Sequence, residues 1–81
     1  MTGLKRETKE TTITIEIDVD GGEIDVQTDE VFVTHMVETF ARYAGLGLKL
    51  RATGDMKHHL MEDVAITLGL ALKEAILSLI H

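Results

Sequence analysis

Residues 11–28 read TTITIEIDVDGGEIDVQT and decide the fold, because apolar and polar side chains alternate along both halves of this stretch. Such alternation is typical of strands with one buried face. Gly21 and Gly22 separate the two halves, and paired glycines are typical of a turn. We therefore expect two strands joined as an antiparallel hairpin with one apolar face. The apolar positions are Ile13, Ile15, Ile17, Val19, Ile24 and Val26.

The rest of the chain predicts a helix, a third strand and a second helix. Apolar residues recur at helical spacing through residues 32–44, with Asp29 available as the N-cap and Gly45 as the C-terminal stop. Residues 46–52, LGLKLRA, alternate again and predict the third strand. From about residue 56 to 80 the chain consists almost entirely of good helix formers, which predicts a long second helix.

The second helix carries more apolar residues than one helical stripe can hold, so we expect it to be buried on more than one face. A sheet of three strands covers only one side of such a helix. We therefore expect the other side to pack on another subunit of a symmetric homo-oligomer. The residues concerned are Leu60, Met61, Val64, Ile66, Leu68, Leu70, Leu72, Ile76, Leu77, Leu79 and Ile80.

Length and composition restrict the class of protein. With 81 residues, the chain forms at most one domain, residues 1–81, with a core of marginal stability. It contains no cysteine and shows no signal peptide or membrane span, so we expect a cytoplasmic protein without disulfides. Eight Lys and Arg against fourteen Asp and Glu give a net charge of −6, which disfavours nucleic acid as a partner and favours metal or cationic ligands.

Residues 54–69, GDMKHHLMEDVAITLG, place two adjacent histidines at the start of the second helix. His58 and His59 lie four and three residues before Glu62, so both imidazoles neighbour that carboxylate. The two histidines diverge by about 100° around the helix axis, which indicates two ions, or one ion completed by another chain. Imidazole and carboxylate ligands suit Mn, Fe, Zn or Ni. The alternative is a solvated helix cap, and His35 is either a further ligand or a surface residue.

Three motifs in this order carry a family resemblance. RETKETTITIEIDVDGG, VFVTHMVETFARYAG and GDMKHHLMEDVAITLGLALKEAI together resemble the first half of imidazoleglycerol-phosphate dehydratase, an enzyme of histidine biosynthesis. The short Gly-x-x-x-His-His spacing is instead similar to the second half of that family, so the chain is a mosaic of the two tandem halves. This combination fits an unduplicated single repeat or a reconstructed one.

The resemblance implies a fold and a metal site. It implies an α+β fold, a two-layer α/β sandwich of β-β-α-β-α order with both helices on one face, related to the second domain of ribosomal protein S5. It also implies that His35, His58, His59 and Glu62 bind manganese, with Glu10 and Glu62 as catalytic acid/base candidates. Metal sites formed between subunits would then hold a symmetric assembly together.

The sequence departs from the family pattern at several positions. Thr34 replaces the acid before the helix-one histidine, and Leu48 stands where the second half carries a strand histidine. Segments that grip the substrate phosphate in the family have no counterpart here, although basic side chains offer either replacements or plain surface charges. These side chains are Lys5, Arg6, Lys9, Lys49, Arg51 and Lys57.

Two hypotheses from different classes therefore follow. In the first, the protein is a manganese-dependent hydro-lyase that removes water from imidazoleglycerol phosphate. In the second, it is a non-catalytic homo-oligomeric module in which the metal or the apolar helix surface serves assembly only.

Overall fold

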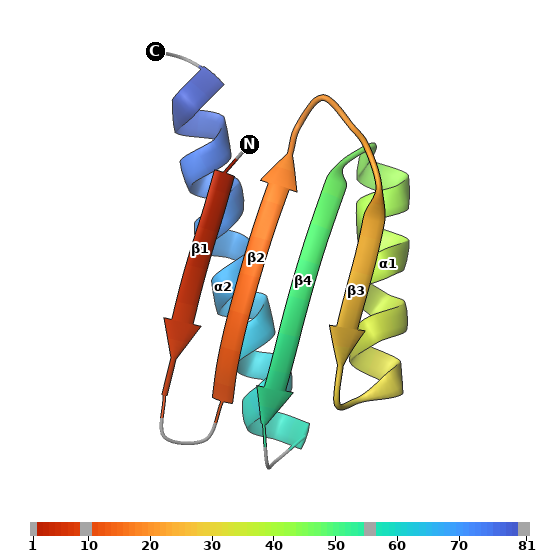
Figure 1. Ribbon diagram of the computed structural model, residues 1–81, viewed down its shortest axis with the longest axis vertical. Helices are drawn as coiled ribbons and strands as arrows, with labels where there is room; N and C mark the ends of the chain where they lie inside the picture. Colours follow the sequence, from red (N-terminus) through yellow and green to blue (C-terminus); the bar gives the residue numbers. More distant parts are fainter. Residues whose placement is uncertain (1, 9–10, 55–56, 80–81) are drawn as a thin grey trace.

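The protein is an α+β sandwich of two layers, with a four-stranded sheet on one side and two helices on the other (Figure 1). The structure is a computed structural model that describes residues 2–8, 11–54 and 57–79, without the side chains of residues 57–59. Along the chain the elements are β1 (Thr2–Glu7), β2 (Thr11–Asp18), β3 (Ile24–Thr28), α1 (Val31–Ala44), β4 (Gly47–Gly54) and α2 (Lys57–Leu79). The predicted class, with both helices on one face, is confirmed.

The order of the strands in the sheet is β1-β2-β4-β3, and this order corrects the predicted hairpin. β2 and β3 form as expected, but β4 lies between them, antiparallel to β2 and parallel to β3. The connection between β2 and β3 passes over the beginning of β4, where a Cβ on Gly47 would lie 2.9 Å from the carbonyl oxygen of Gly21. A strand that follows a helix pairs readily in parallel with the strand before that helix, and here this βαβ pairing replaces the hairpin.

β1 is a fourth strand that the sequence analysis did not predict, so the order is β-β-β-α-β-α rather than β-β-α-β-α. It pairs antiparallel with β2 at the edge of the sheet. Its sequence, TGLKRE, contains a single large apolar residue, Leu4, and three charges. Charged residues are common on edge strands because only part of such a strand needs to be buried.

The core lies between the sheet and the helices. β2 contributes Ile13, Ile15 and Ile17, which are at most 1% exposed, and Leu50 of β4 lies opposite Ile15. α2 packs on β1, β2 and β4, whereas α1 packs on β3. The buried positions of α2 recur at three- and four-residue intervals, as expected for one face of a helix. They are Leu60, Val64, Thr67, Ala71 and Ala75.

The two ends of α1 explain where this helix starts and stops. Glu30, and not the predicted Asp29, is the N-cap, and its side chain accepts a hydrogen bond from the backbone N–H of Phe32 at 3.3 Å. Asp29 instead accepts a hydrogen bond from the backbone N–H of Gly54 at 3.2 Å and so ties the start of α1 to the end of β4. Gly45 ends the helix as predicted, in the left-handed conformation with φ of 71°.

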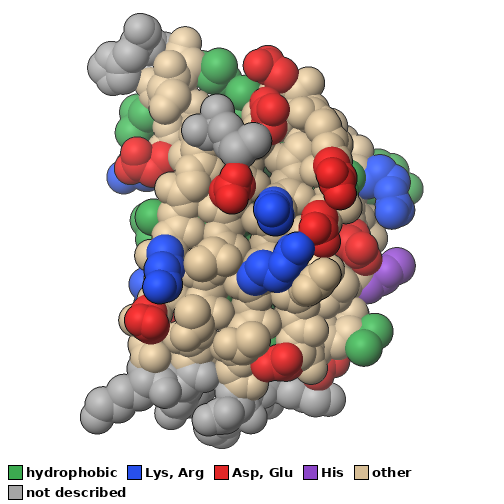
Figure 2. All heavy atoms as spheres, viewed as in Figure 1, with side chains coloured by type: hydrophobic (Ala, Val, Ile, Leu, Met, Phe, Trp, Pro, Cys, Tyr) green, Lys and Arg blue, Asp and Glu red, His purple; other side chains and the backbone are tan. Residues whose placement is uncertain are grey.

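The outer face of the sheet is polar. Thr12, Thr14, Glu16 and Lys49 are exposed there, and Figure 2 shows basic and acidic side chains spread over this face. Within the described part of the chain, no helix is both long and apolar enough to cross a membrane.

Candidate functional site

The predicted metal ligands belong to both helices. His35 is exposed on α1, and Glu62 is exposed on α2, one turn after the helix begins. His58 and His59 lie in the first turn of α2, but their side chains are outside the described part of the structure, as is Glu10. Among the described side chains, no three His, Cys, Asp or Glu residues come together in a group that could hold a metal ion. The assignment of these five residues to a metal site or to catalysis therefore stays a prediction.

Thr34 and Leu48, where the resemblance implies an acid and a histidine, have structural roles. Thr34 shares a hydrogen bond of 2.7 Å with the hydroxyl of Thr28 and so ties the first turn of α1 to the end of β3. Leu48 is 2% exposed and belongs to the core. A side chain at this position therefore contributes to packing.

Two of the basic side chains considered for phosphate binding are paired with carboxylates. Arg6 Nε lies 3.5 Å from Asp63 Oδ1, and Arg51 Nη2 donates to Asp25 Oδ2 at 2.8 Å. The hydrogen bond and charge of Arg51 lower the pKa of the Asp25 carboxyl below its ordinary value. Lys5 and Lys49 are exposed, whereas Lys9 and the side chain of Lys57 are outside the described residues.

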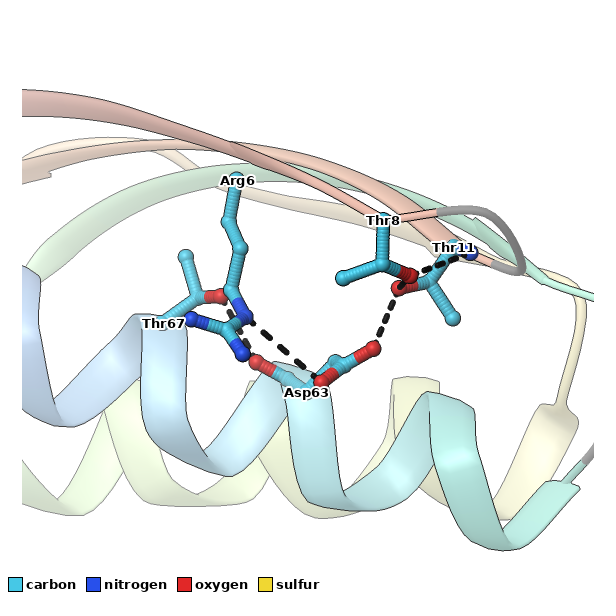
Figure 3. A network of polar contacts seen from close by, with 5 residues as sticks. All are labelled: Arg6, Thr8, Thr11, Asp63 and Thr67. Atoms are coloured by element: carbon cyan, nitrogen blue, oxygen red, sulfur yellow. Dashed lines mark hydrogen bonds and ion pairs between the residues drawn. The ribbon is translucent and has the colours of Figure 1, made fainter.

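Asp63 is the polar residue that links the sheet to α2 next to the histidine motif (Figure 3). Its Oδ2 accepts a hydrogen bond from the hydroxyl of Thr11 in β2, and its Oδ1 faces Arg6 of β1. Its backbone carbonyl accepts a hydrogen bond from the hydroxyl of Thr67 at 2.6 Å. One residue of α2 thus holds side chains from the two neighbouring strands β1 and β2.

The Asp63 cluster was missed in the sequence analysis, although a signal for it exists. Residue 63 lies three positions after Leu60 and four before Thr67, both of which are buried. A carboxylate on this side of the helix needs a partner, because burying an unpaired charge costs free energy. Glu62, its neighbour in sequence, lies on the exposed side of α2 and carries no such requirement.

An apolar groove of about 210 Å³ lies between the two helices. Met36 and Phe40 of α1 line one side, and Met61, Ala65 and Leu68 of α2 line the other. Further along α2, Ile66, Leu70 and Ile76 are between 44% and 55% exposed. The helix layer thus presents an apolar surface on the side away from the sheet.

The structure defines a two-layer α+β sandwich whose candidate ligands belong to the helices and whose interlayer polar cluster adjoins the histidine motif. The family model for imidazoleglycerol-phosphate dehydratase matches residues 28–79. This chain is 51% identical over 77 residues to imidazoleglycerol-phosphate dehydratase of Methanosarcina mazei, and 45% identical over 75 residues to that of Hydrogenobaculum sp.. These matches cover 90% and 88% of this chain, but 40% and 39% of the relatives.

A solved structure agrees with these relatives. The crystal structure of IGPD from Pyrococcus furiosus in complex with (S)-C348 matches with a TM-score of 0.79 and 44% identity, over 88% of this chain and 39% of that chain. The chain belongs to the imidazoleglycerol-phosphate dehydratase family. It spans about two fifths of the length of the curated relatives that it matches.

Proposed function

We propose that this chain is a metal-binding, self-assembling half-domain that dehydrates imidazoleglycerol phosphate once it is assembled. The observation that carries this proposal is the His-His-x-x-Glu motif at the start of α2, inside the region that the family model matches. The relatives are named for the dehydratase reaction. Because apolar side chains are exposed along α2, we propose that several copies together form the catalytic unit.

The donor set fits a divalent transition metal. His35, His58, His59 and Glu62 would supply imidazole nitrogens and carboxylate oxygens, which suit manganese. His35 and Glu62 are exposed, so they are accessible to an ion and to a neighbouring subunit. Because His58 and His59 diverge by about 100° around the helix axis, we propose that the site is shared between subunits.

The carboxylates of the chain would carry the proton transfer. A bound metal would stabilise negative charge on the substrate imidazole. Glu62 is exposed beside the histidine motif and can take or return a proton in that setting, and we propose Glu10 as the second acid/base group. One of these carboxylates would take the proton from a carbon of the glycerol chain and the other would protonate the hydroxyl on the neighbouring carbon, so that the C–H and C–O bonds break, a C=C bond forms and water leaves.

The apolar helix surface supports self-assembly. Ile66, Leu70 and Ile76 are exposed along α2, and the groove beside Met36 and Met61 is apolar. Exposed apolar surface of this kind is typical of association sites. The same surface also favours the second candidate function, a homo-oligomeric module without catalysis, because association requires none of the catalytic groups.

Turnover of imidazoleglycerol phosphate with added manganese tests the proposal. We expect Glu62→Gln to lower kcat by about 100-fold or more, because the amide keeps the shape but loses the base and the metal ligand. Glu74→Gln is the matched control on the same helix, at another exposed position, and should keep wild-type turnover. Native mass spectra with manganese and with a chelator would count subunits and ions. A fully metallated assembly without turnover would leave only the non-catalytic module.

A further inference from the structure

The Asp63 carboxylate uses both of its oxygens to hold the end of the sheet. The Asp63 side chain is 14% exposed, and Thr11, which donates to Oδ2, is 2% exposed. Arg6 Nε is buried and makes no hydrogen bond, and the carboxylate 3.5 Å away is the charge that it faces. Loss of this carboxylate would therefore leave a cation and a buried hydroxyl without their partner.

The hydroxyl of Thr11 passes this anchor on to Thr8. Because the single hydroxyl proton of Thr11 goes to Asp63, its oxygen accepts the proton of the Thr8 hydroxyl, 2.9 Å away. The backbone N–H of Thr11 donates to Thr8 Oγ1 at 3.0 Å, and the backbone N–H of Thr8 donates to the Thr11 carbonyl at 2.8 Å. These bonds join the two residues that flank Lys9 and Glu10, and Figure 3 shows the side chains of both threonines directed toward Asp63.

The same anchor lies at the end of β4, the strand that precedes the histidine motif in sequence. Thr11 is the register partner of Gly54, the last residue of β4, and residues 55 and 56 alone separate Gly54 from α2. Glu10 precedes Thr11 in sequence, and Glu62 precedes Asp63. One hydrogen bond, from Thr11 to Asp63, thus joins the segments that carry the two acid/base candidates.

We propose that Asp63 is a positioning residue that ties the end of β1 and the start of β2 to α2, and that turnover depends on this link because Glu10 and Glu62 are the sequence neighbours of Thr11 and Asp63. The catalytic part of this statement rests on the proposed function, whereas the anchoring of the two strands does not. Small displacements of an acid/base group are costly in catalysis, because proton transfer needs hydrogen-bond distance. Asp63 acts through Thr11 and does not need to touch the substrate.

Two threonine variants separate positioning from general stability. Thr11→Val removes the hydroxyl that binds Asp63 and keeps the shape of the side chain. Thr67→Val is the matched control, because Thr67 is also buried, lies on the sheet side of α2 and donates only to the backbone of residue 63. Thr11→Ser restores the hydroxyl and should restore wild-type behaviour.

Amide hydrogen exchange, followed by NMR on the assembled protein, tests the anchor without any assay of activity. We expect Thr11→Val and Asp63→Asn to accelerate exchange of the Thr8 amide about tenfold or more relative to that of Leu50, and Thr67→Val to leave this ratio unchanged. An unchanged Thr8 amide in Thr11→Val would overturn the proposal, whether or not the protein is an enzyme.

Steady-state kinetics with imidazoleglycerol phosphate and manganese test the catalytic consequence. In Thr11→Val we expect kcat to fall about tenfold or more with an almost unchanged KM, and Thr11→Ser to recover it. Equal losses of kcat in Thr11→Val and Thr67→Val would show a structural role only and overturn the positioning role of Asp63. If the wild-type protein does not turn over, the proposed function fails, and faster exchange at Thr8 would still support the anchor.

Discussion

Among the described residues, two arginine–aspartate pairs connect neighbouring elements, and they differ in surroundings more than in distance. Arg51 and Asp25 join β4 to β3 on the outer face of the sheet at 2.8 Å, with side chains 37% and 33% exposed. Arg6 and Asp63 join β1 to α2 between the layers at 3.5 Å, and Asp63 is 14% exposed. The longer pair is the one that also binds a buried hydroxyl. Burial and shared hydrogen bonds, rather than the shortest distance, should therefore decide which pair stabilises the fold.

The largest expected effect is the loss of the interlayer carboxylate. Asp63→Ala should lower the free energy of unfolding by about 2 to 3 kcal/mol, because Thr11 and Arg6 both lose their partner in a largely buried place. Urea unfolding at a fixed protein concentration measures this change. Glu74→Ala, at an exposed position on the same helix, should stay within about 0.5 kcal/mol of the wild type. A similar small effect at Asp63 would contradict the proposed difference between the two pairs.

A smaller effect is expected for the coupling between Arg6 and Asp63 alone. A double-mutant cycle with Arg6→Gln and Asp63→Asn should give a coupling energy of about 1 kcal/mol, because Arg6 is partly exposed and its Nε makes no hydrogen bond. Coupling close to zero would assign the stabilising role of Asp63 to Thr11 alone.

The outer pair should contribute little to stability. We expect Arg51→Gln to unfold at the same urea concentration as the wild type within experimental error, because both partners are exposed to solvent. Raising the salt concentration should change the free energy of unfolding even less in the variant than in the wild type. A clear loss of stability in Arg51→Gln would show that exposed pairs matter in this sheet.

The smallest effect concerns a single titration. Arg51 lowers the pKa of Asp25 from its ordinary 3.8, so the pair favours the folded state at neutral pH. That contribution is lost as the pH falls below 3.8 and through the folded-state pKa. NMR titration of the Asp25 carboxyl should show its pKa rising toward the ordinary value in Arg51→Gln, and Lys49→Gln should produce a smaller rise. No rise in Arg51→Gln would rule out the arginine as the cause.

The sequence predicted the helices better than the sheet. The helical spacing through residues 32–44 and the stop at Gly45 depend on local interactions, so both were confirmed. The hairpin prediction failed because the partner of β3 is β4, which follows only after α1. β1 was missed because an edge strand buries few side chains, and TGLKRE shows almost no apolar alternation. Strand pairing depends on contacts between distant parts of the chain, which a local pattern does not contain.

The sequence likewise predicted one part of the candidate site and missed another. The sequence analysis predicted a metal and acid/base role for Glu62 and none for Asp63. The structure separates them, since Glu62 is exposed and Asp63 is tied to Thr11. The partner of Asp63, Thr11 at the start of β2, lies 52 residues earlier in the chain, so a local pattern does not identify it. The ligand roles of His35, His58 and His59 stay predictions.

The order of the strands has a consequence for aggregation. Within the described sheet, β1 and β3 each have one side without a neighbouring strand, and unpaired strand edges can add strands from other molecules. Both edges are short, and exposed Lys5 and Glu7 on β1 and the Asp25–Arg51 pair beside β3 place charges along them. Such charges oppose fibril-like addition of strands. We therefore expect the two sheet edges to resist the addition of strands from other molecules. Aggregation, where it occurs, should start from the apolar surface of the helix layer.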